Sequence, residues 1–395
     1  MNLIQQPLRT PTGESLRFSR SVQIALVLIC ACLMTAGCAL TSWQLPRTDE
    51  ESNGGTAASL LCTTPAPTNA SEVANLFTTA DPRVFAGGDG ILAARLGSGR
   101  TLVITADNFT DPSGGQLPPT IGPGTAMRHN AAFLTQDGCL RAASTGELLP
   151  TVYADPAGAP RYFWPSALIT HDDTTFTLFA DVMTTSASSA LNSFDFHRVG
   201  VARYTIRVIG STVIAEREAD LPGDPAGISW SAGGGRDSAG RAVIYGSRAD
   251  ATAWEIFAAR TDDPLSDPST WEYSTVHGWQ IGGTPAPVAH NCSDAVGPLP
   301  GDPYRFATKL GGAIGTDVAL LRVDPATGRV VMSAVVAQVP STTEMWSYNP
   351  QFFPVSDRQS ALLINHNSMS AETHDRAAFS PAAIMDVMHD DPIWR

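Results

Sequence analysis

Short runs of alternating apolar and polar residues, separated by turns rich in Gly, Pro and Asp, fill the chain from about residue 80 onward. The first two runs, 91–96 and 101–107, flank the turn 97–100 and predict a β-hairpin. Asp89 stands just before the first strand and Asp107 ends the second. Antiparallel pairing therefore predicts that these two carboxylates meet at one edge of the sheet.

The same hairpin pattern recurs along the chain. The copies cover 89–107, 166–181, 229–246 and 349–365, and a poorer copy covers 290–307. Further hairpins, at 201–217 and 318–335, lie between them, so that each unit holds two hairpins. Two hairpins make a four-stranded blade, and five such units predict an all-β, five-bladed β-propeller over residues 80–395. A β-sandwich with accidental self-similarity is the alternative.

The N-terminal residues follow a different pattern. A basic segment with Arg9, Arg17 and Arg20 precedes an apolar run, 24–34, that is too short to span a bilayer. Small residues then lead to Cys38, as in the lipobox of bacterial lipoproteins. We therefore expect residues 1–37 to be a lipoprotein signal peptide. An ordinary signal peptide or a short anchor is the alternative.

If Cys38 is lipidated, it becomes the first residue of the mature chain. Residues 38–79, rich in Thr, Ser, Gly, Ala and Pro, are then a flexible tether. The expected location is the cell envelope, at the outer face of the bacterial cytoplasmic membrane, with the lipid on Cys38 as the membrane contact.

Charge and cysteine content narrow the function classes. The formal net charge of −13 argues against nucleic acid as a partner. Cys62, Cys139 and Cys292 remain in the mature chain, which allows at most one disulfide. Their spacing matches no metal site, so we expect no metal and no cofactor, and we expect a monomer.

Polar and aromatic residues stand where the repeated hairpins begin. In a propeller these positions converge on a central funnel, where polar groups pair with sugar hydroxyls and aromatic rings pack on sugar faces. Asp181 is a candidate third acidic group, and His129 could tune a carboxylate. The candidate catalytic residues are Asp89 and Asp107, and the candidate substrate-binding residues are Asn130, Trp164, Ser229, Trp230, Asn349 and His366.

Several short motifs resemble the actinobacterial domain-of-unknown-function 4185 family, also classed as glycoside hydrolase family 183, the endo-D-arabinanases. They are GGDG, LGSGRTL and ITADNF at the start, then MRHNAAF, RYFWPSA, ISWSAG, AVIYGSR and WEYSTVHGW. The resemblance implies a five-bladed propeller that hydrolyses D-arabinan, with Asp89 and Asp107 as the catalytic pair. Ala106 and Asn108 depart from the glycine and threonine usual in that family, and Ser166-Ala167 stands where an acidic residue is expected.

Two carboxylates at one rim suit glycoside hydrolysis, in which one donates a proton and the other activates water or attacks. We expect inversion, with Asp107 as the acid because a strand end is the more buried position. Turn capping is the structural alternative for both aspartates. At the level of function, the alternatives are a non-catalytic carbohydrate-binding envelope lipoprotein and an enzyme acting on another furanoside or on host glycans.

Overall fold

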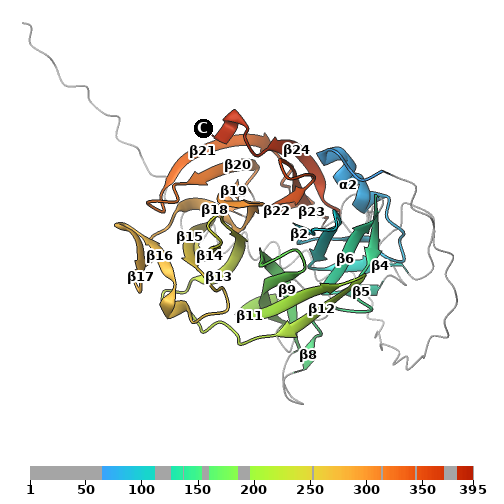
Figure 1. The fold of residues 1–395 in the computed structure, drawn as a ribbon, viewed down its shortest axis with the longest axis horizontal. Helices are drawn as coiled ribbons and strands as arrows, with labels where there is room; N and C mark the ends of the chain where they lie inside the picture. The colour runs from blue at the N-terminus through green and yellow to red at the C-terminus, as the bar shows by residue number, and fades with distance from the viewer. Residues whose placement is uncertain are drawn as a thin grey trace, which may run out of the picture. The chain divides into compact units, whose positions relative to one another are not determined.

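The computed structural model describes residues 65–111, 126–136, 138–153, 160–185, 196–250, 253–312, 315–342, 345–368 and 380–394. Antiparallel strands dominate them, in agreement with the all-β prediction (Figure 1). In this part of the chain no helix is both long enough and apolar enough to cross a membrane.

The strands fall into five consecutive groups. Group 1 is β2 (Leu92–Arg95), β3 (Thr101–Thr105), β6 (Ala131–Gln136) and β7 (Cys139–Ala142). Group 2 is β8 (Val152–Tyr153), β9 (Pro160–Thr170), β10 (Thr175–Thr185), β11 (Phe196–Ile209) and β12 (Thr212–Arg217). Group 3 is β13 (Ser229–Arg236), β14 (Ala242–Asp250), β15 (Ala253–Thr261), β16 (Glu272–Thr275) and β17 (Gly278–Ile281). Group 4 is β18 (Ala289–Leu299), β19 (Asp302–Leu310), β20 (Asp317–Val323) and β21 (Val330–Gln338), and group 5 is β22 (Met345–Pro354), β23 (Gln359–Ser368) and β24 (Ala382–Met388).

Groups 3 and 4 are joined into one nine-stranded sheet by β15 and β18. Within each group, pairing follows chain order, and the predicted hairpins are present: Leu92 pairs with Ile104 across the turn after β2, and Ala319 pairs with Val335 in group 4. Three short strands, β1 (Gly87–Gly88), β4 (Asn108–Thr110) and β5 (Ala126–Arg128), form a separate small sheet. The described residues also form the 3-10 helices η1 (Pro268–Thr270) and η4 (Pro392–Trp394).

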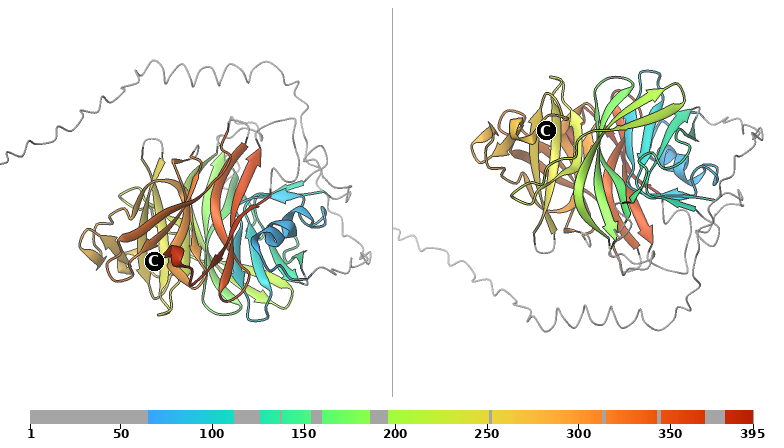
Figure 2. Two further views of the ribbon diagram at one scale, coloured as in Figure 1. Left: turned by 90° about the horizontal axis from the view of Figure 1, so that it is seen from above. Right: turned by 90° about the horizontal axis from the view of Figure 1, so that it is seen from below.

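One strand from each group takes part in a closed ring: β2, β9, β13, β18 and β22, called the first strands from here on because the β8 that precedes β9 has only two residues. β2 contacts β9, β9 contacts β13, β13 contacts β18, β18 contacts β22, and β22 returns to β2. Figure 1 shows the groups arranged around this common centre, and Figure 2 shows the strands of neighbouring groups side by side. The arrangement is propeller-like, and it brings the starts of all five first strands to one end of the ring.

A hydrophobic cluster fills each interface between successive groups. Alternate residues of one strand serve two clusters: Phe176 and Leu178 of β10 pack toward group 1, whereas Phe179 packs toward group 3. Three further clusters join groups 3 and 4, groups 4 and 5, and groups 5 and 1. Because both faces of these sheets are buried, the strands read as apolar with few breaks.

Helix α2 (Ala70–Thr78) lies within the segment predicted to be a tether. Asn69 caps it by accepting a hydrogen bond from the backbone N–H of Glu72. Its apolar face is buried, and Phe77 makes edge-to-face contacts with Phe85 and Phe353. The folded part of the chain therefore includes residues N-terminal to position 80.

Gly297 of β18 lies at a tight point of the ring. A Cβ at this position would lie 2.3 Å from the carbonyl oxygen of Pro350 and 2.8 Å from the Cα of Gln351, both on β22. Because these are backbone atoms, we expect Gly297→Ala to force the two strands apart and to lower the free energy of unfolding by about 1–3 kcal/mol.

Gly223→Ala is the matched control, since no atom lies within 4 Å of a Cβ built there. Thermal denaturation of the two variants is the measurement. A melting temperature several degrees lower for Gly297→Ala alone is expected, and equal melting temperatures would contradict the close approach of β18 and β22.

Candidate active site

A cavity of about 390 Å³ opens where the first strands begin. We call it the aspartate cavity because four carboxylates line it: Asp89, Asp107, Asp181 and Asp294. Its other lining side chains include Trp164, Ser166, Arg198, Ser231, Trp254, Ser293, Lys309, Trp346, Tyr348, Asn349 and Asn367. All five strand groups contribute, because the ring gathers their starts at this end.

Asp89 and Asp107 lie opposite each other at the end of the first hairpin, as the sequence predicts. The backbone N–H of Asp89 donates to the Asp107 carbonyl at 2.9 Å, and the N–H of Asp107 donates to Oδ1 of Asp89 at 3.0 Å. Gly90 makes this possible: its φ is 59°, and a Cβ there would lie 2.5 Å from the Cβ of Ala106. The GGDG sequence thus holds the two carboxylates on adjacent backbones.

Asp89 is partly buried, and its second oxygen accepts a hydrogen bond from the hydroxyl of Tyr348. The pKa of Asp89 is raised to about 7, mainly by burial and secondly by the nearby Asp107 carboxylate. The hydrogen bonds from Tyr348 and from the N–H of Asp107 oppose this rise. Burial also raises the pKa of Tyr348 well above its usual value, so the phenol keeps its proton. Near neutral pH, Asp89 therefore holds a proton that it can donate.

Asp107 is held through one oxygen by two ring nitrogens. The indole Nε1 of Trp164 donates to Oδ1 of Asp107 at 3.0 Å, and Nδ1 of His129 lies 3.3 Å from the same atom. The His129 ring stacks on Tyr162, with ring centroids 4.0 Å apart. The Asp107 side chain keeps 22% of its surface exposed. This carboxylate is oriented by its partners and still open to the cavity.

A second charged cluster lies on the cavity wall formed by groups 2 and 3. Nη1 of Arg198 lies 3.3 Å from Oδ1 of Asp181, and the hydroxyl of Ser231 donates to that same oxygen at 2.6 Å. Arg198 also donates to Ser229 at 3.0 Å. Burial raises the pKa of Asp181, whereas the Arg198 charge opposes this rise.

Group 4 adds Asp294 and Lys309. Asp294 is exposed, whereas Lys309 is fully buried and donates through Nζ to the carbonyl oxygen of Ser347 at 2.5 Å. Burial lowers the pKa of Lys309 to about 8, and the nearby Asp294 carboxylate opposes the fall. The sequence pattern gave no reason to select these two residues, because neither stands at a predicted strand start with an aromatic neighbour.

The family model described as "Domain of unknown function (DUF5005)" matches residues 72–386. The chain belongs to the DUF5005 family. The match covers all five strand groups, whereas membership of the domain-of-unknown-function 4185 family is not confirmed and stays a prediction. No curated protein matches the chain.

The chain is also similar to several solved structures. A candidate hydrolase from Bacteroides ovatus has a TM-score of 0.56 and 15% identity, and the alignment covers 80% of this chain and 88% of that one. A glycosyl hydrolase from the same organism (TM-score 0.46, 11% identity) is covered over 94% of its length, with 83% of this chain. A family 117 glycoside hydrolase from Zobellia galactanivorans (TM-score 0.43, 11% identity) is covered over 83%, with 76% of this chain. At 15% identity the likeness to the first of these structures is one of fold.

The DUF5005 domain brings some predicted binding residues to the cavity. Trp164 and Asn349 line it, and Asn349 has a φ of 51° with its side-chain oxygen held by Gln351 at 2.7 Å. Ser229 lies outside the lining and contacts Arg198. The side chain of His366 also lies outside, bonded through Nδ1 to Ser347 at 2.8 Å, while its neighbour Asn367 lines the cavity.

Two predicted binding residues are buried instead. Asn130 is fully buried and bonds with the backbones of Leu149 and Phe163. Trp230 packs against Trp271 and Tyr273, and its indole donates to Asp224. Both side chains fasten strands within the DUF5005 domain, and neither lines the aspartate cavity. Sequence alone does not separate such fastening residues from binding residues, since both stand near strand starts.

Three tryptophans line the aspartate cavity: Trp164, Trp254 and Trp346. Their flat faces suit the apolar faces of sugar rings, while the carboxylates and amides beside them suit hydroxyl groups. Trp254 and Trp346 were not predicted. Trp254 lies on β15, the third strand of its group, and Trp346 precedes the predicted start at Asn349.

Cysteine and metal predictions fall partly outside the described residues. Cys38 and Cys62 lie there. Cys139 is disulfide-bonded, and Cys292 has a free, buried thiol. Among the side chains that the structure describes, no cluster of three or more His, Cys, Asp or Glu residues could hold a metal ion.

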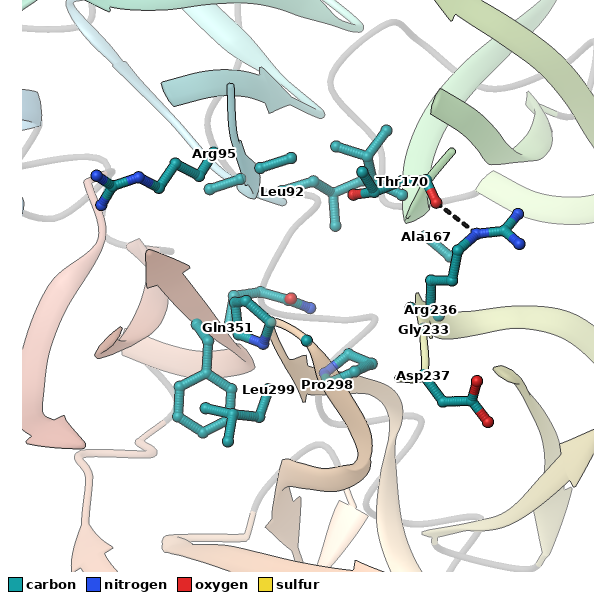
Figure 3. Close-up of a pocket in the computed structure, with 18 of the residues that line it drawn as sticks. Leu92, Arg95, Ala167, Thr170, Gly233, Arg236, Asp237, Pro298, Leu299 and Gln351 are labelled. Carbon is teal, nitrogen blue, oxygen red and sulfur yellow. Dashed lines mark hydrogen bonds between the residues drawn. The ribbon is translucent and has the colours of Figure 1, made fainter. Parts of the chain in front are cut away.

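A second cavity, of about 360 Å³, lies where the first strands end (Figure 3). Its charged side chains are engaged within the protein: Nε of Arg236 donates to the carbonyl oxygen of Thr170 at 2.6 Å, and Asp237 pairs with Arg241 at 3.1 Å. Figure 3 shows Arg95 extending away from the cavity, and this residue pairs with Asp357 at 3.5 Å. Among its described lining residues this cavity has a single carboxylate, Asp237, whereas the aspartate cavity holds the pair Asp89 and Asp107.

Proposed function

We propose that this protein is a glycoside hydrolase of the cell envelope that cleaves arabinofuranosyl linkages of arabinan. The observation that carries the proposal is the pair Asp89 and Asp107 in a cavity lined by three tryptophans. The pKa of Asp89 is raised to about 7, which suits a general acid, and the neighbouring Asp107 carboxylate contributes to that rise. The motif resemblance described above supports arabinan as the substrate.

The proposed reaction uses the two aspartates in different roles. Asp89 donates its proton to the leaving glycosidic oxygen as the bond from that oxygen to the anomeric carbon breaks. Asp107 accepts a proton from water, whose oxygen attacks the anomeric carbon with inversion. The roles are the reverse of the sequence prediction, which gave Asp107 the acid role. The raised pKa of Asp89 is the physical reason for the exchange.

We also propose the five-bladed architecture, the envelope location and the partners that the sequence predicts. The closed ring of first strands and the five interface clusters support a five-bladed propeller. The lipobox ahead of Cys38 supports export, lipidation and attachment to the outer face of the cytoplasmic membrane. The expected partners are envelope arabinan and the membrane, with a monomeric chain.

A carbohydrate-binding lipoprotein without catalysis is the second candidate. One observation favours it: both oxygens of Asp89 already accept hydrogen bonds, from Asp107 N–H and from Tyr348. A carboxyl held in this way can serve to fasten the hairpin to β22. The same aromatic and polar lining suits a binding protein as well as an enzyme.

Incubation of the detergent-solubilised full chain with purified D-arabinan, in parallel with mannan and galactan, separates these candidates. Release of oligosaccharides from D-arabinan supports the hydrolase. Retention of intact D-arabinan without cleavage supports the binding protein. Cleavage of mannan or galactan alone would contradict arabinan as the substrate while leaving the hydrolase proposal standing.

Asp107→Asn tests the electrostatic link between the two aspartates. Removing the Asp107 charge removes one cause of the raised pKa of Asp89, so that pKa falls. The remaining activity is therefore expected to be lost at a lower pH than in the wild-type enzyme, together with a decrease in kcat. The measurement is kcat/KM from pH 4 to 9. An unchanged alkaline limit would show that Asp107 does not tune Asp89.

A further inference from the structure

The aspartate cavity has a second wall that the proposed reaction does not use. It carries Asp181 on β10, Arg198 beside it on β11, Ser231 on β13 and Asp294 on β18. In the ring of first strands, β2 contacts β9 and β22, whereas β13 and β18 contact each other on the far side. Ser231 and Asp294 therefore lie across the ring from the Asp89 hairpin, and Asp181 and Arg198 of group 2 connect them to the Trp164 side of the cavity.

Arg198 is oriented by one end of its guanidinium. Its contacts with the described residues Asp181, Ser229 and Ser231 are all made through Nη1, at 3.0–3.4 Å. Within the described residues, Nε and Nη2 make no hydrogen bond, and 25% of the side chain is exposed. The Asp181 partner offsets the charge of Arg198 but leaves N–H donors for a ligand.

Asp294 supplies the complementary acceptor. It is exposed and lines the same cavity, and within the described part of the chain its carboxylate has no hydrogen-bond or ion-pair partner. A sugar hydroxyl both donates and accepts. Neighbouring hydroxyls can therefore donate to Asp294 and accept from Arg198 at the same time, with a tryptophan face against the ring.

The balance of charge decides which sugars fit. Four carboxylates and two cations, Arg198 and Lys309, line the cavity, so its net charge stays negative even when Asp89 is protonated. A sugar that carries a carboxylate, sulfate or phosphate would enter against this net negative charge and beside Asp294, whose carboxylate makes no hydrogen bond or ion pair with the described residues. Like charges a few ångströms apart repel strongly where water is partly excluded.

We infer that the wall of Arg198 and Asp294 is a subsite for an uncharged sugar unit, and that Asp294 makes the cavity select neutral glycans against acidic ones. The inference rests on the proposed function only in sharing its cavity and its carbohydrate ligand. It names the class of substrate, neutral polyhydroxylated sugars, and it names the two side chains that select it.

Matched ligand pairs test the inference. Neutral oligosaccharides from D-arabinan, galactan and mannan are compared with the same oligosaccharides after oxidation of their primary hydroxyls to carboxylates. Isothermal calorimetry on the full chain gives both dissociation constants. The neutral member of a pair is expected to bind at least about tenfold more tightly, and added salt should reduce this ratio through screening.

Asp294→Asn keeps the shape of the side chain and removes its charge. This variant is expected to narrow the neutral-to-acidic ratio by about tenfold, mainly through tighter binding of the oxidised member. Asp220→Asn is the matched control, because Asp220 is exposed and pairs with Arg217 outside the cavity lining. The control should leave the ratio unchanged.

The outcomes separate this inference from the proposed hydrolase. Three results would each overturn the subsite. Oxidised ligands could bind more tightly than neutral ones, or no neutral ligand could bind. The neutral-to-acidic binding ratio could also be independent of salt and unchanged in Asp294→Asn. Charge-selective binding of neutral sugars without any cleavage would keep the subsite and remove the hydrolase. Hydrolysis of an acidic glycan would overturn the neutral-sugar subsite and support the hydrolase.

Discussion

Asp89→Asn is expected to lower kcat for hydrolysis of the envelope glycan by about 10²–10⁴-fold. Asparagine keeps the size of the side chain and can accept from the N–H of Asp107, but it carries no proton that it can give to a leaving oxygen. KM should change much less, because the tryptophans and the opposite wall of the cavity remain. The measurement is kcat and KM on the polysaccharide that the wild-type chain cleaves.

Wild-type enzyme should also lose activity as the pH rises through about 7, since Asp89 then loses the proton that it donates. Asp220→Asn, on the exposed surface, should retain wild-type kinetics. Full activity of folded Asp89→Asn would rule out Asp89 as the acid. It would also contradict the catalytic pair that the motif resemblance implies.

The same substitution is expected to stabilise the protein at alkaline pH. In the folded state the pKa of Asp89 is about 7, well above the ordinary value of 3.8. Below about pH 4 the carboxyl is protonated in both states. Between these two values the unfolded chain releases the proton while the folded chain holds it, so the stability of the wild-type protein decreases as the pH rises.

At pH 8 the full penalty for burying this carboxylate is present in the wild-type protein and absent in Asp89→Asn. The variant should then unfold with a free energy higher by on the order of 2–4 kcal/mol, and the difference should vanish near pH 4. Urea denaturation at pH 4, 6 and 8 checks this. Parallel stability curves for the two proteins would show that Asp89 is not held in a destabilising site.

An enzyme in which one carboxylate costs stability and supplies activity fits a general trade-off at active sites. A purely structural Asp89 predicts the opposite sign. If its role were to fasten the hairpin to Tyr348, then replacement by Asn would lower stability at every pH, and the alkaline gain would be missing.

The hairpin that carries Asp89 and Asp107 could be predicted from sequence because local rules determine it. The turn after residue 96 fixes the register, alternation fixes the face, and Gly90 supplies the backbone conformation that follows Asp89. The recurrence of this pattern predicted the later hairpins, among them β9–β10 and β22–β23, for the same reason.

The far wall of the cavity could not be predicted in this way. Arg198 and Lys309 lie on later strands of their groups, and they reach the cavity only because the ring closes around it. Trp230 shows the converse error: it stands at a predicted strand start, but its indole packs into the core between groups 2 and 3. Long-range packing decides such cases, and a periodic pattern carries no information about it.

The assignment of the acid failed for a related reason. Position within a strand suggested Asp107, whereas the relevant quantity is the environment of each carboxyl. Asp107 accepts from Trp164 and lies near His129, residues that stand 57 and 22 positions away in the chain. Asp89 is partly buried against β22 and lies near the charge of Asp107.

The most direct test of the hydrolase with Asp89 as its acid is proton NMR of D-arabinan during incubation with the wild-type chain and with Asp89→Asn, at pH 6. New reducing-end anomeric signals are expected with the wild-type chain, first in the inverted configuration, and almost none with the variant. Signals that grow at equal rates with both proteins, or with neither while the polysaccharide stays bound, would contradict this expectation.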